Sequence, residues 1–99
     1  MTCSRLNPNN GFEIRAGIKQ IIIPQGSASK YEEVYFSPAF TKTNVAVVMT
    51  DNDWRTPHDF IPKLSVLQKN QSKCTLNASL PAAQSSATDI NVGWIAIAW

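Results

Sequence analysis

The sequence predicts an all-β fold, a sandwich or barrel of short strands, on three observations. No window carries a sustained apolar stripe at the i, i+3 and i+4 spacing of an amphipathic helix. The six prolines fall at intervals that interrupt most helical candidates. Six segments rich in β-branched and aromatic residues are separated by turn-forming residues. A chain of 99 residues corresponds to one domain.

The first three predicted strands are defined by β-branched and alternating residues. "GIKQIII" (17–23) is β-branched and ends before a proline. "EVYFS" (33–37) alternates, so that Val34 and Phe36 share one face. "NVAVVMT" (44–50) is rich in valine and is apolar in both alternating positions.

The last three predicted strands are "KLSVLQK" (63–69), "SKCTLNA" (72–78) and "DINVGWIAIAW" (89–99), of which the last is the longest. The joints between the strands are rich in Gly, Pro, Ser, Asn and Asp, which favour turns. They are predicted at 24–30, 37–43, 50–60, 68–73 and 80–88, with a hairpin turn at 68–73.

Two predicted strands are apolar on both faces. After Gly93 the final strand places Ile95 and Ile97 opposite Trp94, and the 44–50 strand behaves similarly. A sandwich strand with one solvent-exposed face would alternate apolar with polar residues. The outer faces of these two strands must therefore be covered by something outside the sandwich core. A second copy of the chain is the simplest cover. The predicted interface residues are Val45, Val47, Trp94, Ile95, Ile97 and Trp99.

The chain divides into an N-terminal arm, predicted over residues 1–16, and a β-domain over 17–99. The arm contains "NPNNG", a turn-rich run without a strand pattern, and we interpret it as a docking element. Cys3 and Cys74 would permit a disulfide, but free thiols are favoured because "MTCSRLNPNN" shows no secretory signal. We therefore expect synthesis in the cytoplasm.

Charge and motifs argue against several function classes. The nine basic residues are scattered and the formal net charge is +2, which disfavours a nucleic-acid partner. The apolar runs are too short for membrane insertion. A calcium loop starting at Asp51 would need glycine and glutamate where Thr56 and Pro62 stand. With one histidine and no "G-x-S-x-G", neither a zinc site nor a serine hydrolase is indicated. No enzyme, metal or cofactor is expected.

The loop "TDNDWRTPHDF" has two interpretations. It is either a solvated turn between strands or a contact loop, because an exposed tryptophan beside an arginine is typical of binding hot spots. Trp94 and Trp99 are assigned to core and interface. The candidate contact residues are Asp53, Trp54, Arg55, His58 and, after the loop, Lys63, with Tyr31 and Tyr35 as further aromatic candidates.

Four stretches together resemble the H-type lectin domain of snail agglutinins and discoidins, which also occurs on some phage tail fibres. They are "VYFSPAF" (34–40), "NVAVVMTDND" (44–53), "KLSVLQKNQSKCTLNA" (63–78) and "VGWIAIAW" (92–99). The resemblance covers residues 17–99. It implies a six-stranded antiparallel β-sandwich that forms a homotrimer and binds galactose-type sugars between subunits.

The resemblance places Lys63 at the basic position of the family's sugar site. The first loop, "PQGSASKYEE", has no aspartate, and the last, "LPAAQSSATD", has no aromatic residue or histidine, where the family has such residues.

The resulting function hypothesis is a non-enzymatic, trimeric, lectin-like protein for surface or glycan recognition, of phage tail-fibre type and located in the virion. The alternative is a capsid decoration or cement trimer that uses the fold for assembly without binding sugar. Across the two hypotheses, the expected partners of the chain are further copies of itself, carbohydrate or other virion proteins.

Overall fold

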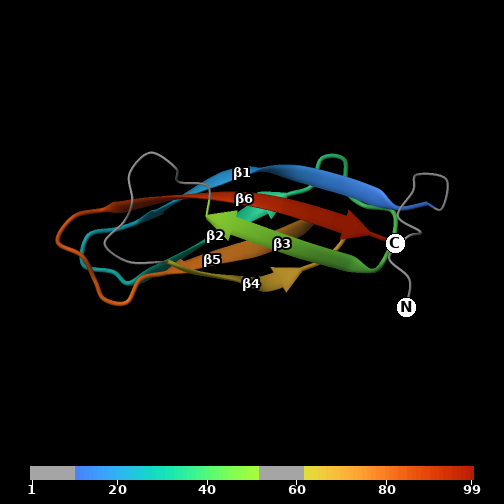
Figure 1. Cartoon of the computed structure of the whole chain (residues 1–99). Coiled ribbons are helices and arrows are strands. Elements are labelled where there is room, and N and C mark those ends of the chain that lie inside the picture. Colours follow the sequence, from blue (N-terminus) through green and yellow to red (C-terminus); the bar gives the residue numbers. More distant parts are fainter. Residues whose placement is uncertain (1–10, 52–61) are drawn as a thin grey trace.

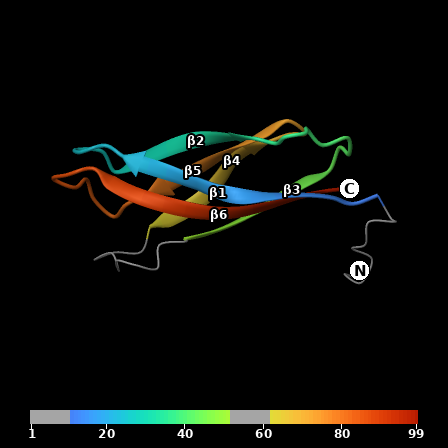
Figure 2. The ribbon, with the colours of Figure 1, turned by 90° about the horizontal axis from the view of Figure 1, so that it is seen from above.

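The computed structural model describes residues 11–51 and 62–99, which form two three-stranded sheets packed face to face (Figures 1 and 2). The strand orders are β1-β6-β3 and β2-β5-β4, and every pair is antiparallel. No helix occurs in these residues. The all-β, six-stranded antiparallel sandwich is therefore confirmed. The strands are β1 (Glu13–Ile23), β2 (Ser29–Tyr35), β3 (Val45–Asp51), β4 (Lys63–Lys69), β5 (Lys73–Ser79) and β6 (Thr88–Ala98).

The core lies between the two sheets and is built from one alternating set of side chains on each strand. Ile21, Ile90 and Val92 from one sheet and Leu76 from the other are fully buried. Phe36 and Phe40 are also buried in this core, with ring centroids 4.8 Å apart. Burying an aliphatic or aromatic side chain contributes about 1.5–3 kcal/mol, so this cluster supplies the main driving force for folding.

Strand boundaries follow the predicted segments closely, and the largest differences lie in β1 and β2. β4 spans 63–69 as predicted. β2 starts at Ser29, four residues earlier than predicted, because Ser29 and Lys30 pair with β5 although their side chains are polar and exposed. Val34 and Phe36 are buried on one face, as the alternation predicts.

β1 begins at Glu13, so residues 13–16, which the sequence places in the arm, belong to the sheet. The polarity pattern does not indicate a strand here because Glu13 and Arg15 are charged, although each side chain has a partner within the chain. One Glu13 carboxylate oxygen accepts hydrogen bonds from the Thr41 amide (2.8 Å), the Thr41 hydroxyl (2.9 Å) and the Lys42 amide (3.0 Å). Arg15 donates to the Pro38 carbonyl at 3.0 Å, and its guanidinium lies 4.9 Å from the Phe40 ring centroid. Residues 1–10, most of the predicted arm, lie outside the described residues.

The Glu13 contacts predict an acid-sensitive element. Partial burial alone raises the pKa of the Glu13 carboxyl, but the hydrogen bonds from Thr41 and Lys42 and the Arg15 charge outweigh it and lower the pKa. The contribution to stability is therefore present above about pH 4.3, where an unfolded glutamate ionises, and is lost as the pH falls through the lower folded value.

We expect Glu13→Gln to be less stable than the unchanged chain at pH 7, with the difference shrinking below pH 4. Urea unfolding at both pH values measures this. The matched control is Glu32→Gln, since Glu32 has no hydrogen bond or ion pair among the described residues. A Glu13→Gln deficit that is equal at both pH values would contradict the assignment.

The predicted hairpin turn at 68–73 is confirmed. The Asn70 side-chain oxygen accepts hydrogen bonds from the Ser72 amide (2.8 Å), the Ser72 hydroxyl (2.9 Å) and the Lys73 amide (3.0 Å). The Asn70 amide donates to the Lys73 carbonyl at 2.9 Å. Asparagine thus acts as the local organiser of the turn that joins β4 to β5.

The apolar C-terminus is held by the residue that precedes β3. The Trp99 amide donates to the Asn44 carbonyl at 3.0 Å, and the Asn44 amide donates to the Trp99 carbonyl at 3.2 Å. The Asn44 side chain adds a third bond to the same carbonyl at 2.9 Å. The Trp99 side chain is nevertheless 48% exposed, so the backbone and not the indole anchors this residue.

Cys74 is a free, buried thiol on the inner face of β5. Burial raises the pKa of this thiol, which disfavours the reactive thiolate. Cys3 lies outside the described residues.

Candidate functional site

The outer face of sheet β1-β6-β3 is apolar. Strand register aligns three successive rows across it: Ile14–Ile97–Ala46, Ala16–Ile95–Val48 and Ile18–Gly93–Thr50. Ile18 and Val48 are 66% and 67% exposed in the single chain, and Ile14 is 57% exposed. Thr50 on β3 is the one polar residue in these rows, and further polar residues follow beyond them, where Gln20 pairs with Asn91. We call these nine residues the apolar face. An exposed, contiguous apolar patch of this kind marks an interaction surface.

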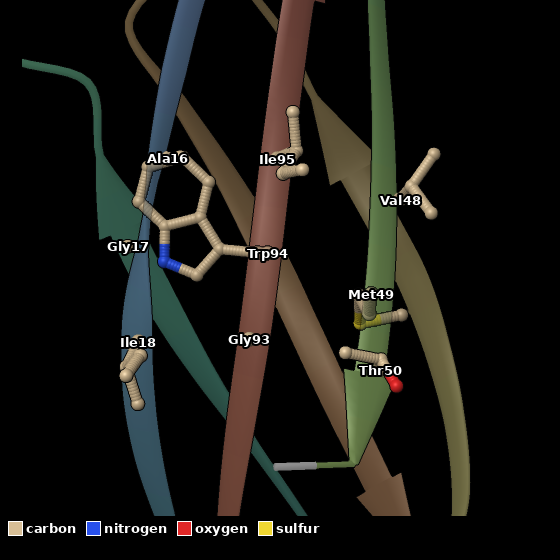
Figure 3. A pocket seen from close by; sticks show the side chains of 9 residues that line it. All are labelled: Ala16, Gly17, Ile18, Val48, Met49, Thr50, Gly93, Trp94 and Ile95. Carbon is tan, nitrogen blue, oxygen red and sulfur yellow. The ribbon is translucent and has the colours of Figure 1, made fainter.

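A hollow of about 430 Å³ lies on the apolar face (Figure 3). It forms because Gly93, in the central strand, has no side chain between Ile18 and Thr50. The walls are the side chains of Ile18, Val48 and Ile95. The hollow therefore accepts an aliphatic side chain from outside, and its lining offers few polar partners.

Beneath the sheet, the Trp94 indole packs against β1 at Gly17. A β-carbon placed on Gly17 would lie 3.0 Å from the Trp94 ring. The ring also contacts Phe36, with centroids 5.8 Å apart. The absence of a side chain at Gly17 thus allows the indole to lie against the strand.

We expect Gly17→Val to destabilise the chain by about 1–3 kcal/mol, the usual effect of overpacking a core. Thermal unfolding measures the loss. Adding Trp94→Leu to the same chain should recover part of the lost stability, since leucine leaves room for the valine side chain at position 17. If the two substitutions are simply additive, the ring contact is not the cause.

The predicted interface residues divide between the two faces of the sheet. Ile95 and Ile97 lie on the apolar face. Val45, Val47 and Trp94 lie on the inner face and pack against the buried core of the same chain. Trp99 follows the end of β6 and is half exposed.

The opposite outer face, on sheet β2-β5-β4, is polar and aromatic. Register places Glu33 beside Thr75, which in turn lies beside Gln68. Tyr31 and Tyr35, on the same face of β2 as Glu33, are 61% and 66% exposed. Their side chains are thus available to a partner, in contrast to the buried phenylalanines of the core.

Glu33 organises this polar face. The Tyr35 hydroxyl donates to one carboxylate oxygen at 2.6 Å, and the Lys73 ammonium donates to the other at 3.0 Å. The hydrogen bond from Tyr35, followed by that from Lys73, lowers the pKa of Glu33. The same contacts raise the pKa values of Tyr35 and Lys73. All three groups therefore keep their ordinary protonation states at neutral pH, and the Glu33–Lys73 pair carries no net charge.

A trough of about 320 Å³ crosses this face. Its low point is Thr75, which is 7% exposed. Tyr31 and Glu33 line one side, and Leu67 and Gln68 line the other. A register shift between Val66 and Gln68 adds Leu67 as an extra residue and bends β4 beside the trough. We call these five residues the trough.

Most of the predicted contact loop falls outside the described residues, namely Asp53, Trp54, Arg55 and His58. Lys63 is described: it begins β4, is exposed and pairs with Ser79. Across residues 11–51 and 62–99, no group of three or more His, Cys, Asp or Glu side chains is arranged to hold a metal ion. The same residues contain no helix that could span a membrane.

Sequence reasoning missed the contribution of β1 to the apolar face and did not foresee the trough. In β1, Glu13, Arg15 and Lys19 alternate with isoleucines, and the charged set shares the inner parity with buried Ile21. The signal for the apolar face was the spacing of Ile14 and Ile18. Both have the same parity in β1 and pair with residues on the outer face of β6. For the trough, only the Tyr31 and Tyr35 aromatic candidates pointed to the correct sheet.

No family model and no curated protein matches this chain. Among solved structures, the chain is similar to the tailspike protein gp49 from Pseudomonas phage LKA1, with a TM-score of 0.59 and 19% sequence identity. The similarity covers 89% of this chain and 15% of the tailspike chain. The chain thus spans only a small part of the length of this tailspike, and at this identity the likeness concerns the fold.

Proposed function

We propose that this chain is a non-enzymatic, phage tail-associated binding module of the lectin-like type, which works as a homotrimer in the virion. The observation that carries the proposal is the apolar face of sheet β1-β6-β3. The fold similarity to a phage tailspike supports the tail association, and the sequence resemblance to H-type lectin domains supports the trimer and a recognition role.

A second copy of this chain fits the apolar face better than a charged or hydrated partner. The three rows contain no charged residue, so a partner gains nothing from charge there. The protruding Ile18 and Val48 side chains and the hollow over Gly93 give the face both knobs and a hole. A knob of one copy can enter the hole of the next, which is the head-to-tail contact that a closed ring of copies needs.

Sedimentation velocity and native mass spectrometry of the purified chain at micromolar concentration test the assembly. The expected result is a single species of three chains. A stable monomer would refute the homotrimer. Immunogold labelling of the phage particle then distinguishes the tail from the capsid, and label on the capsid would favour the alternative of a decoration or cement protein.

A further inference from the structure

We propose that the trough on the outer face of sheet β2-β5-β4 binds a neutral saccharide, with Tyr31 as its stacking platform. The inference deepens the proposed function and rests on it, since a sheet β1-β6-β3 covered by other copies leaves sheet β2-β5-β4 as the outward surface. The trough lies on β2, β5 and β4, in the middle of a sheet and within one chain.

The polar groups of the trough match the hydroxyls of a sugar. Gln68 offers an amide donor and acceptor, and Thr75 offers a hydroxyl. Neither side chain has a hydrogen-bond partner among the described residues. Each Glu33 carboxylate oxygen already accepts one hydrogen bond and has a second lone pair for a ligand hydroxyl. A sugar hydroxyl both donates and accepts, so it satisfies this mixed set.

The charge of the site favours a neutral ligand. The Lys73 ammonium lies 3.0 Å from the Glu33 carboxylate, and this pair cancels the charge beside the trough. An anionic sugar would meet the Glu33 carboxylate without a free cation among the five trough residues. A cationic ligand would compete with Lys73 for the same carboxylate oxygen.

Tyr31 supplies the apolar surface that a sugar ring needs. Its ring is 61% exposed at the edge of the trough, and no ring contact within the described part of the chain occupies it. Aromatic rings of this kind combine a large apolar face with a polar tip, which suits ligands that are apolar on one side and wet on the other. Leu67, 54% exposed across the trough, gives a second apolar contact.

The test is a titration of the isotope-labelled full chain with maltohexaose, cellohexaose and chitohexaose, followed by amide shifts in NMR spectra. An oligogalacturonate serves as the anionic probe. We expect at least one neutral hexasaccharide to shift the amides of Tyr31, Gln68 and Thr75. Tyr31→Ala should weaken that binding at least about tenfold, since truncating a hot-spot aromatic residue has effects of this size.

Matched variants keep the result interpretable. Tyr31→Phe retains the ring and should bind within about threefold of the unchanged chain, whereas Gln25→Ala, in an exposed turn, should bind equally well. The inference is overturned if no neutral hexasaccharide shifts these amides, if the shifts fall on another face, or if oligogalacturonate binds as tightly. The oligomer measurement separates this result from the proposed function: a monomer that binds sugar through the trough refutes the trimer alone, and a trimer without sugar shifts refutes the trough alone.

Discussion

Replacing Ile18 with lysine is expected to convert the proposed homotrimer into monomers that remain folded. Ile18 is 66% exposed in the single chain, so a lysine there remains solvated in the monomer and changes its stability little. In an assembly that covers the apolar face, the same ammonium group would be buried without a partner. An uncompensated buried charge costs about 3–5 kcal/mol, and a symmetric ring repeats that cost at every interface.

Sedimentation velocity measures the loss of the trimer, and circular dichroism measures retention of the fold. The matched control is Leu67→Lys, since Leu67 is 54% exposed on the other sheet and should leave the trimer intact. If Ile18→Lys still forms trimers, the apolar face is not the contact between copies. If both lysine variants dissociate, the effect comes from added charge in general and not from this face.

Ending the chain after Gly93 is expected to abolish cooperative folding. The truncation deletes residues 94–99, of which 94–98 are the part of β6 that pairs with β1 on one side and with β3 on the other. Ala96 and Ala98 are fully buried, and Trp94 packs on the core cluster. Removing a packed tryptophan alone costs about 3–5 kcal/mol, and the whole domain has about 5–15 kcal/mol of stability.

Thermal unfolding monitored by circular dichroism tests the truncation. A chain ending at Ala98 is the control, because it keeps every β6 pairing and loses only Trp99, with its half-exposed side chain and its hydrogen bonds to Asn44. We expect the control to unfold cooperatively at a moderately lower temperature. A cooperative transition in the chain that ends at Gly93 would show that β1 and β3 do not need the central strand.

Most of the fold was predictable because strand formation depends on local patterns. β4 matches its predicted range, and the Asn70 turn lies within its predicted segment. β1 and β2 were predicted too short at their N-terminal ends for one shared reason: polar residues there pair through the backbone, and for Glu13 and Arg15 the side chains have partners distant in sequence. A pattern of side-chain polarity cannot reveal a partner that folding brings from residues 38–42.

The all-β class and the apolar residues on both sides of the last strand follow from residue type and from the two-residue period of a strand, so both could be predicted without a structure. The packing of the two sheets against each other sets which side of each strand faces the core. It turned Val45, Val47 and Trp94 inward and left Ile95, with Ile18 and Val48 beside it, on the surface. The tertiary structure also assembled the trough, because Tyr31, Thr75 and Gln68 lie on three strands and become neighbours only through sheet register.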